Sequence, residues 1–371
     1  MEIVNFLGDY IGSGGIESFL NNISAQLVSC GYRYIICSSF PSDSIYISEF
    51  KKKGAQVEFI SCGRKGYMKK MLAYKRYLST HENAIVHIHA SSASMYPYAF
   101  VAKIAGIKNI IYHVHSTMKP NRTPKEKVKE CLFTVAFKNI PVSNIGCSKK
   151  ACESVFKKNS YSVVDNGIDV NRFEYNPTLR TSIRRKLGIE DDFVIGQIGR
   201  FCPQKNQLFT LGVMNALKSN EKIKCILVGE GADDQKVREY IVSNGLDNKV
   251  KIIKPCNDVE KYYQAFDAFV FPSVFEGFGI VALEAQISGL PMICSEHIIS
   301  DVKLTNAVIS IPLDNQEAWV NEVENLATQM GRDRNQISVE AIEKCKQKGF
   351  TASSAADKVM KIYMRNVKQK Q

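Results

Sequence analysis

Two glutamates flank a glycine-rich turn in the segment FPSVFEGFGIVALEAQISGLPMICSE, residues 271–296. The pattern predicts a strand, a tight turn, a helix over 280–287 and then a second strand. In such a unit the backbone N–H groups of the turn and the positive end of the helix lie at the carboxyl edge of a parallel sheet, where a phosphate binds. Glu276 precedes the helix and Glu284 lies inside it. Because a carboxylate accepts two hydroxyl hydrogen bonds from a diol, the segment predicts a nucleotide-sugar site.

The spacing of these glutamates, E-x7-E inside FPSxxEGFGIVxLEA…GxPxI, resembles the donor signature of retaining GT-B glycosyltransferases. Within that group it is most similar to glycosyltransferase family 4 (group 1), the enzymes of bacterial capsule and exopolysaccharide assembly. The resemblance implies that Glu276 orients hydroxyl groups of the donor sugar and that Glu284 holds the ribose. It also implies that backbone N–H groups of Phe278 and Gly279 bind the phosphates, with Ile280 beside them. The alternative is a pair of surface glutamates on an ordinary α/β unit.

Two basic side chains lie in the segment GRFCPQKN, residues 199–206. Arg200 offers a planar fork of donors and Lys205 a point charge, and together they can neutralise a diphosphate. The segment is similar to the family's G-R-x-x-x-x-K-x loop, which implies that both residues stabilise the charge that develops on the departing nucleotide diphosphate. A surface loop without function is the alternative. The resemblance adds three donor-binding positions, namely Asn206, Gly229 and Lys254.

A second glycine-rich segment, GSGGIE at residues 12–17, follows the first expected strand and opens the first expected helix. Glycines there allow the backbone to approach an anion closely. The segment is not G-x-G-x-x-G and no acidic residue ends the next strand, so a dinucleotide fingerprint is disfavoured. The family resemblance implies that Gly14 and Gly15 face the donor phosphate and the acceptor. A purely structural strand-to-helix turn is the alternative.

Four histidines form two His-x-His pairs at the ends of expected strands, namely His87 with His89 and His113 with His115. Side chains two residues apart share one face of a strand, so each pair could in principle bind a metal ion. No third ligand is evident beside either pair, and the chain contains no D-x-D motif. We therefore predict no metal site and no cofactor, with the nucleotide-sugar acting as a substrate.

The segment IIYHVHS, residues 110–116, resembles the family's strand that ends in the active-site histidine, which matches His115. The resemblance implies that this imidazole lies beside the donor sugar and its anomeric carbon. His89 and His113 either line the acceptor side or are structural histidines, and the structural reading is slightly favoured. Asn166 belongs to an N-G-x-D loop that the family places at the crossing between domains, on the acceptor side.

Composition and charge narrow the class of protein. The chain has 371 residues, 45% of them hydrophobic, which is enough for two domains, and no apolar run reaches the length of a membrane span. We read no signal peptide in the first residues, and the odd number of cysteines, 11, without a C-x-x-C pair favours reduced cytoplasmic thiols. Residues 1–175 carry 23 Lys and Arg against 13 Asp and Glu, a net +10, and the rest carries 26 against 24, a net +2. A basic first domain favours an anionic partner such as a membrane surface.

Alternation of short apolar strands with helices predicts an α/β fold with doubly wound parallel sheets. The expected strands are 2–7, 32–37, 55–60, 84–89, 109–115 and 144–147, then 193–196, 224–228, 250–253, 268–271, 291–294 and 308–311. The resemblance implies the GT-B arrangement of two Rossmann-like domains that face each other across a cleft. We expect an acceptor-binding domain over 1–175 and a donor-binding domain over 176–351, with a final helix, 352–371, that returns to the first domain.

The sequence therefore predicts a retaining, metal-independent hexosyltransferase. It would move a hexose or N-acetylhexosamine from a nucleotide-sugar, UDP in preference to GDP, to a glycan acceptor linked to a lipid pyrophosphate. The expected location is the cytoplasm, at the inner face of the membrane. One alternative is a GT-B-shaped nucleotide-sugar epimerase, for which the first domain offers no convincing pair of acid and base carboxylates. Another is a nucleic-acid-binding protein, suggested by a pI near 9.0, but no zinc, RRM or helix-turn-helix signature supports it, and we expect no nucleic acid as a partner.

Overall fold

The computed structural model describes residues 1–60, 66–117, 122–137, 140–156, 160–329 and 333–368. Packing divides the chain into two compact units, the first formed by residues 1–167 and 349–371 and the second by residues 168–348. The short helix α7, Val170–Phe173, belongs to the second unit because the hydroxyl of Ser288 donates a hydrogen bond to the carbonyl oxygen of Phe173 at 2.8 Å. The sequence analysis places the two boundaries after residues 175 and 351.

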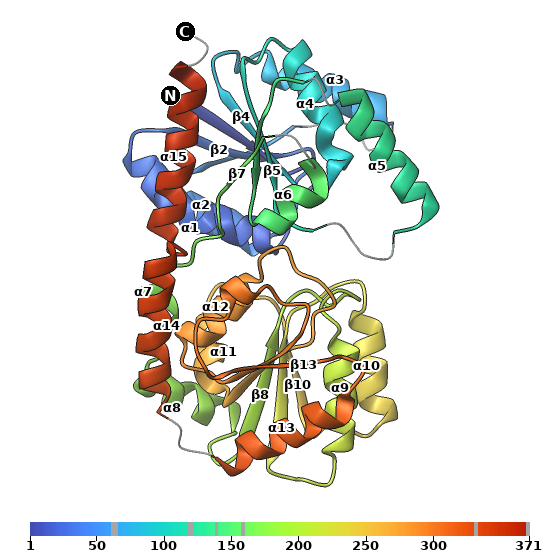
Figure 1. Ribbon diagram of the computed structural model, residues 1–371, viewed down its shortest axis with the longest axis vertical. Coiled ribbons are helices and arrows are strands. Elements are labelled where there is room, and N and C mark those ends of the chain that lie inside the picture. The colour runs from blue at the N-terminus through green and yellow to red at the C-terminus, as the bar shows by residue number, and fades with distance from the viewer. Residues whose placement is uncertain (61–65, 118–121, 138–139, 157–159, 330–332, 369–371) are drawn as a thin grey trace. The chain divides into compact units, whose positions relative to one another are not determined.

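The first unit is a seven-stranded sheet whose strands are all parallel, in the order β3-β2-β1-β4-β5-β6-β7 (Figure 1). Its strands are β1 (Glu2–Phe6), β2 (Arg33–Ser38), β3 (Gln56–Phe59), β4 (Ile85–Ala90), β5 (Asn109–Val114), β6 (Ser143–Gly146) and β7 (Ser162–Val163). Its helices are α1 (Gly15–Ser29), α2 (Ile45–Lys52), α3 (Tyr67–Leu78), α4 (Tyr96–Ile104), α5 (Pro124–Phe137), α6 (Lys149–Phe156) and α15 (Ala352–Lys368). Strands β1, β4 and β5 are apolar along most of their length because both faces of a parallel sheet are covered.

The C-terminal helix α15 completes the core of the first unit, as predicted. It packs against α1, and its buried Ala355, Val359 and Tyr363 join the same apolar cluster as Phe19 and Ile23 of α1. The helix is amphipathic, so its period of 3.6 residues aligns these side chains on one face.

The second unit is a six-stranded, all-parallel sheet in the order β10-β9-β8-β11-β12-β13. Its strands are β8 (Phe193–Ile198), β9 (Ile223–Val228), β10 (Val250–Ile253), β11 (Ala268–Phe271), β12 (Met292–Ser295) and β13 (Val308–Ile311). Its longer helices are α8 (Pro177–Leu187), α9 (Gln207–Ala216), α10 (Asp234–Ser243), α11 (Glu260–Ala265), α12 (Ile280–Ile287), α13 (Gln316–Thr328) and α14 (Arg334–Lys348). The only tryptophan, Trp319, is buried in the core of this unit.

Strand order in each sheet reverses once, between β1 and β4 in the first unit and between β8 and β11 in the second. At such a switch point the loops that leave the two neighbouring strands diverge, and ligands of doubly wound sheets bind there, outside the carboxyl ends of the strands. The relevant loops of the second unit are 199–206 and 272–279, which contain the basic and acidic motifs found in the sequence. Among the described residues, no helix is both long and apolar enough to cross a membrane.

Candidate functional site

An ion pair joins the two loops at the switch point of the second unit. The ammonium of Lys205 lies 2.6 Å from Oε1 of Glu276, and the two side chains are 18% and 7% exposed. The same ammonium lies 5.1 Å from the centre of the Phe271 ring, at the end of β11. The structure therefore brings together two of the predicted catalytic residues, although 71 positions separate them in the sequence.

Side-chain amides hold the Lys205 loop in place. Nε2 of Gln197 donates to the carbonyl oxygen of Lys205 at 2.7 Å, and Thr210 donates to Oε1 of Gln197 at 2.8 Å. Gln204 donates to the carbonyl oxygen of Phe275 at 3.0 Å, which ties this loop to the one that carries Glu276. Such fixed loops keep charged groups in one geometry before a ligand arrives.

Asn206 caps α9 in the left-handed region, with φ of 57°. It is the only non-glycine residue with positive φ among those the structure describes. Asparagine tolerates this conformation better than most residues, but the conformation still has a cost and often marks a functional site. The left-handed cap at Asn206 lets the chain turn directly from Lys205 into the helix.

Arg200 and Lys254, the other predicted donor-binding cations, are both exposed at the carboxyl ends of β8 and β10. Within the described part of the chain, the guanidinium of Arg200 forms no ion pair, so it is available to an anion. Gly229 has a structural reason to be glycine, because a Cβ atom there would lie 2.1 Å from the carbonyl oxygen of Gly199. Loops after β8 and β9 thus pass in close contact.

The acidic turn leads into α12 through Gly279, which has φ of 86° and caps the helix. Phe278 and Ile280 are buried, so the segment presents backbone rather than side chains at this point. Backbone N–H groups in the first turn of a helix have no intrahelical partner, which makes them suitable for a phosphate. This geometry is compatible with the predicted roles of Phe278, Gly279 and Ile280.

Glu284 lies one turn into α12 and is buried. The hydroxyl of Tyr263, on α11, donates a hydrogen bond to its Oε2 at 2.6 Å. Burial raises the pKa of the Glu284 carboxyl, and the hydrogen bond from Tyr263 opposes that rise. One carboxylate oxygen is thus held by tyrosine, and the carboxylate keeps further lone pairs for a diol.

In the first unit, a carboxylate occupies the glycine-rich loop. Oε1 and Oε2 of Glu17 accept hydrogen bonds from the backbone N–H groups of Gly12 and Gly14, at 2.7 and 3.0 Å. A Cβ atom on Gly15 would meet nothing within 4 Å. The loop therefore does bind an anionic group in this structure, but that group belongs to the chain itself, and phosphate binding at Gly14 and Gly15 stays a prediction.

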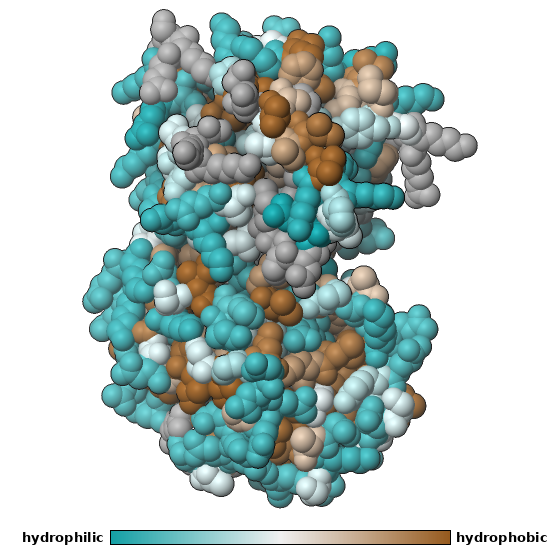
Figure 2. All heavy atoms as spheres, turned by 45° about the vertical axis from the view of Figure 1, so that its right-hand side comes forward, coloured by the Kyte–Doolittle hydropathy of each residue, from teal (hydrophilic) through white to brown (hydrophobic). Residues whose placement is uncertain are grey.

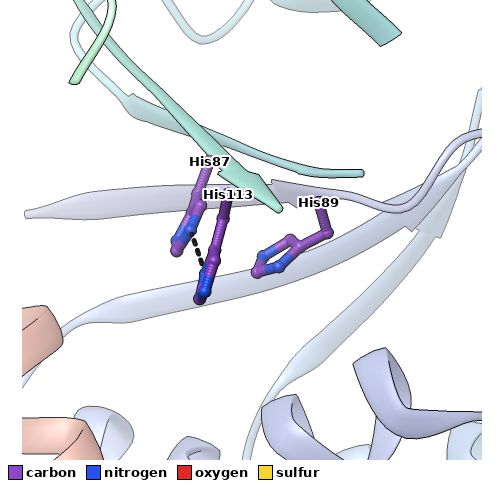
Figure 3. Close-up of side chains that lie close together, drawn as sticks. All are labelled: His87, His89 and His113. Carbon is purple, nitrogen blue, oxygen red and sulfur yellow. Dashed lines mark hydrogen bonds between the residues drawn. The ribbon is translucent and has the colours of Figure 1, made fainter. Parts of the chain in front are cut away.

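The four histidines form two hydrogen-bonded pairs between β4 and the end of β5. Nε2 of His87 lies 3.2 Å from Nδ1 of His113, and Nδ1 of His89 lies 2.9 Å from Nε2 of His115. His87, His89 and His113 are buried, and their rings extend to the same side of the sheet (Figure 3). Their register explains the arrangement, because His89 pairs with His113 across the two strands.

Hydrogen bonds at one end of this cluster assign the tautomer of His115. Nδ2 of Asn5 donates to the carbonyl oxygen of Ile35 at 3.0 Å, so its Oδ1 must accept from Nε2 of His89, 3.2 Å away. Nδ1 of His89 is then the acceptor for an N–H at Nε2 of His115. The unprotonated nitrogen of His115 is consequently Nδ1.

Burial lowers the pKa of all four imidazoles. The shift places the pKa of His115 at about 3, with the Asn166 side chain opposing it, and the pKa values of His87, His89 and His113 are also well below the usual range. At neutral pH the cluster is therefore uncharged. Nδ1 of His115 and Oδ1 of Asn166 have no hydrogen-bond partner within the described residues, so both remain available.

His87, His89 and His113 are close enough to hold a metal ion, because one nitrogen of each lies within 4.8 Å of the others. The sequence shows no third ligand beside either His-x-His pair, because the third histidine comes from the neighbouring strand. Hydrogen bonds already engage these rings with Tyr363, Asn5 and one another, and among the described residues no carboxylate joins the group to balance a cation's charge. We interpret the cluster as a neutral hydrogen-bonded network, and the absence of a metal requirement stays a prediction.

Three supporting residues were missed in the sequence, namely Asn5, Glu17 and Tyr263. Glu17 could have been found, because it stands three residues after the helix cap and forms a capping box. Asn5 and Tyr263 could not be recognised in the sequence, since each forms a hydrogen bond with a residue that is distant in the sequence.

Comparison with known proteins gives a consistent result. Residues 180–344 match the family model described as glycosyl transferases group 1. The chain is 25% identical over 315 residues to the UDP-Gal:alpha-D-GlcNAc-diphosphoundecaprenol alpha-1,3-galactosyltransferase of Escherichia coli, with 80% of this chain and 79% of that protein covered. It is 24% identical over 219 residues to an N-acetylgalactosaminyltransferase of Campylobacter jejuni that acts on a diphospho-undecaprenol-linked sugar, with 59% and 53% covered. The crystal structure of HepE from Anabaena with UDP and glucose superimposes with a TM-score of 0.80 at 18% identity, covering 97% of this chain and 99% of that one.

Proposed function

We propose that this chain is a group 1 glycosyltransferase and that it transfers a hexose or N-acetylhexosamine from a UDP-sugar to a glycan acceptor with retention of anomeric configuration. Its fold is the GT-B fold that the sequence predicted. The observation that carries the proposal is the Lys205–Glu276 pair at the switch point of the second unit. It combines a cation for the diphosphate with a carboxylate for the sugar hydroxyls.

Donor binding would change the contacts of the Lys205–Glu276 ion pair. A diphosphate beside Lys205 competes with Glu276 for the ammonium, which has three donors and can serve both anions. Arg200 adds a second cation on the same loop, and Glu284 with Tyr263 receives the ribose hydroxyls. The preference for UDP over GDP is supported by the name of the Escherichia coli relative, which states a UDP-Gal donor, and by the UDP bound to HepE.

In the transfer step, the bond between the anomeric carbon and the diphosphate oxygen breaks while a bond to the acceptor oxygen forms on the same face. The proton of the acceptor hydroxyl passes to the departing phosphate oxygen, so no protein group gains or loses a proton overall. Arg200 and Lys205 stabilise the negative charge that develops on the diphosphate. Glu276 is held by Lys205 and orients sugar hydroxyls rather than attacking the sugar.

His115 acts on the donor sugar in this proposal. Its ring is neutral and its Nδ1 carries a lone pair, so it can accept a hydrogen bond from a sugar hydroxyl. Because His89 and His113 are buried, we assign them to positioning His115, and their alternative role beside the acceptor, with Asn166, stays a prediction.

We further propose an acceptor linked to a lipid pyrophosphate, used in surface polysaccharide assembly at the cytoplasmic face of the membrane. Support comes from the two relatives whose names state an undecaprenol-diphosphate acceptor. The net charge of +10 on residues 1–175 is compatible with such an anionic acceptor.

A thermal-shift measurement tests the donor site directly. The purified protein is heated with UDP, GDP, ADP or NAD and without added metal, because a ligand that binds only the folded state raises the melting temperature. Selective stabilisation by UDP supports the proposal and selects the UDP-sugars for transfer assays. Stabilisation by NAD alone would overturn it.

A further inference from the structure

Large apolar side chains are exposed on three neighbouring helices of the first unit. Helix α4 packs against both α3 and α5, so the three lie side by side (Figure 1). Of the 15 large hydrophobic side chains exposed among the described residues, eight belong to these helices. We call them the outer apolar patch, and they are Tyr67, Met68, Leu72, Phe100, Ile104, Val128, Leu132 and Val135.

The exposed residues follow helical spacing, so they form stripes. Met68 and Leu72 are four residues apart on α3, and they are 70% and 52% exposed. An adjacent side of the same helix buries Met71, Tyr74 and Leu78 in the unit. Helix α3 is thus apolar on two sides, of which the core covers only one.

Helix α5 shows the pattern most clearly. Val128, Leu132 and Val135 are spaced by four and three residues and are 58%, 63% and 60% exposed. None of the side chains described on this helix is buried. Its start is fixed locally instead, because Thr123 and Glu126 form a capping box and proline occupies the first turn.

Basic residues accompany the apolar stripes. Helices α3, α4 and α5 together contain eight lysines and arginines against two glutamates, a net charge of +6. On α5, Lys125 and Lys129 are exposed on the same stretch as Val128 and Leu132. Figure 2 shows apolar side chains gathered on the first unit in this region, with hydrophilic ones around them.

We propose that the outer apolar patch is a docking surface for a membrane that contains anionic lipids. Amphipathic helices with lysines beside an apolar stripe bind in the plane of such an interface, with the apolar side chains among the acyl chains and the ammonium groups at the phosphates. A protein partner of neutral charge would explain the apolar residues but not the accompanying net charge of +6. The inference deepens the proposed function and rests on it for the lipid-linked acceptor, which lies in the same bilayer.

Co-sedimentation of the full chain with vesicles tests the proposal. The vesicles are phosphatidylcholine alone, or phosphatidylcholine with about one third phosphatidylglycerol. We expect binding to the anionic vesicles that weakens at high salt. The variant Leu72→Glu/Leu132→Glu should lose about tenfold or more of this binding, because each glutamate removes an apolar anchor and adds a repelled charge.

Control variants distinguish a specific effect of the outer apolar patch from a general effect of changing the protein's charge. Val242→Glu/Val339→Glu adds the same charges at exposed apolar positions of the second unit and should bind vesicles like the wild type. Lys125→Gln/Lys129→Gln should weaken binding to anionic vesicles, whereas Lys222→Gln/Lys346→Gln, at exposed positions of the second unit, should not.

The proposal is overturned if Leu72→Glu/Leu132→Glu binds vesicles as the wild type does. It is also overturned if the wild type does not bind the anionic vesicles. If Leu72→Glu/Leu132→Glu then reduces the molar mass of an oligomer in light scattering, a second copy of the chain covers the patch instead. Thermal stabilisation by UDP, measured on every variant, keeps the two proposals distinct. Vesicle binding without a UDP response would refute the proposed function and leave the docking surface standing.

Discussion

The ammonium of Lys205 and the carboxylate of Glu276 meet at 2.6 Å where strand order reverses in the second sheet. Each residue stands in a loop that leaves one of the two neighbouring strands, β8 and β11. The ion pair brings the two motifs into contact although 71 positions separate them in the sequence. A cation and a carboxylate are thereby held next to Gly279, the residue that caps the N-terminus of α12.

Removing either member of this pair should abolish transfer. We expect Lys205→Ala and Glu276→Ala each to lower the transfer rate by about 100-fold or more, because a positioned charge that stabilises the transition state is lost. Each change also leaves a partly buried charge without its partner, so both the rate and the melting temperature are measured. Lys344→Ala, which breaks a solvent-exposed pair with Glu340, is the control and should change neither by much. Transfer at the wild-type rate in either site variant contradicts the assignment.

Most of the architecture could be predicted from local patterns. Three strands, 250–253, 268–271 and 308–311, have the predicted bounds, because short apolar runs between turn residues leave few alternatives. Strand β7, Ser162–Val163, was missed because two residues carry no periodicity. Helix α5 was missed as well, since its apolar residues alternate with lysines and none of its described side chains is buried.

The site was predictable only where its residues form continuous motifs. Lys205, Glu276 and Glu284 stand in such motifs, whereas Tyr263 is one of 16 tyrosines with nothing nearby to distinguish it. Its role depends on how α11 packs against α12, which is a property of the folded unit. Likewise, the fourfold histidine cluster depends on the register of β4 with β5, which neither His-x-His pair reveals alone.

Tyr263 should matter for nucleotide affinity through Glu284. Tyr263→Phe removes the hydroxyl that holds Oε2 at 2.6 Å, and we expect UDP to bind about tenfold more weakly. A UDP analogue without ribose hydroxyls should lose much less, because it makes no hydrogen bond to the carboxylate. Calorimetric titration of both ligands measures the difference. Tyr262→Phe, on the same helix, is the matched control, and an equal loss for both ligands would rule out the ribose role.

The hydrogen-bond chain from Asn5 predicts the tautomer of His115. Nitrogen chemical shifts distinguish protonated from unprotonated ring nitrogens, and we expect Nε2 of His115 to be protonated and Nδ1 not. Asn5→Leu removes the acceptor for His89, so the tautomers should then mix and the transfer rate should fall while UDP affinity stays unchanged. If Nδ1 of His115 carries the proton in the wild type, the orientation assigned to Asn5 is wrong.

Transfer should need no metal ion. We expect dialysis against EDTA to leave the rate unchanged, since in the proposed mechanism Arg200 and Lys205 supply the positive charge for the diphosphate. Metal content measured by mass spectrometry before and after dialysis shows whether His87, His89 and His113 hold an ion. A bound metal whose removal lowers the melting temperature would contradict our interpretation of the cluster, and a lost rate restored by Mg²⁺ would contradict metal independence.

The buried histidines should make the fold sensitive to mild acid. Their pKa values are lowered by burial, so below the ordinary histidine pKa of about 6.5 the unfolded chain takes up protons that the folded chain does not. The stabilising effect of their neutral state is therefore complete above about pH 6.5 and is lost as the pH falls. For each histidine that stays neutral in the folded protein, lowering the pH from about 6.5 to about 5 decreases the free energy of unfolding by about 2 kcal/mol.

Urea unfolding at a series of pH values measures this dependence. His87→Phe keeps a ring in place but removes one titrating group, so its stability should fall less steeply with acid than that of the wild type, by about 2 kcal/mol over the same range. His297→Gln, at an exposed position outside the cluster, is the control and should follow the wild type. Parallel curves for His87→Phe and the wild type would mean that His87 is protonated in the folded protein, and the neutral network would have to be abandoned.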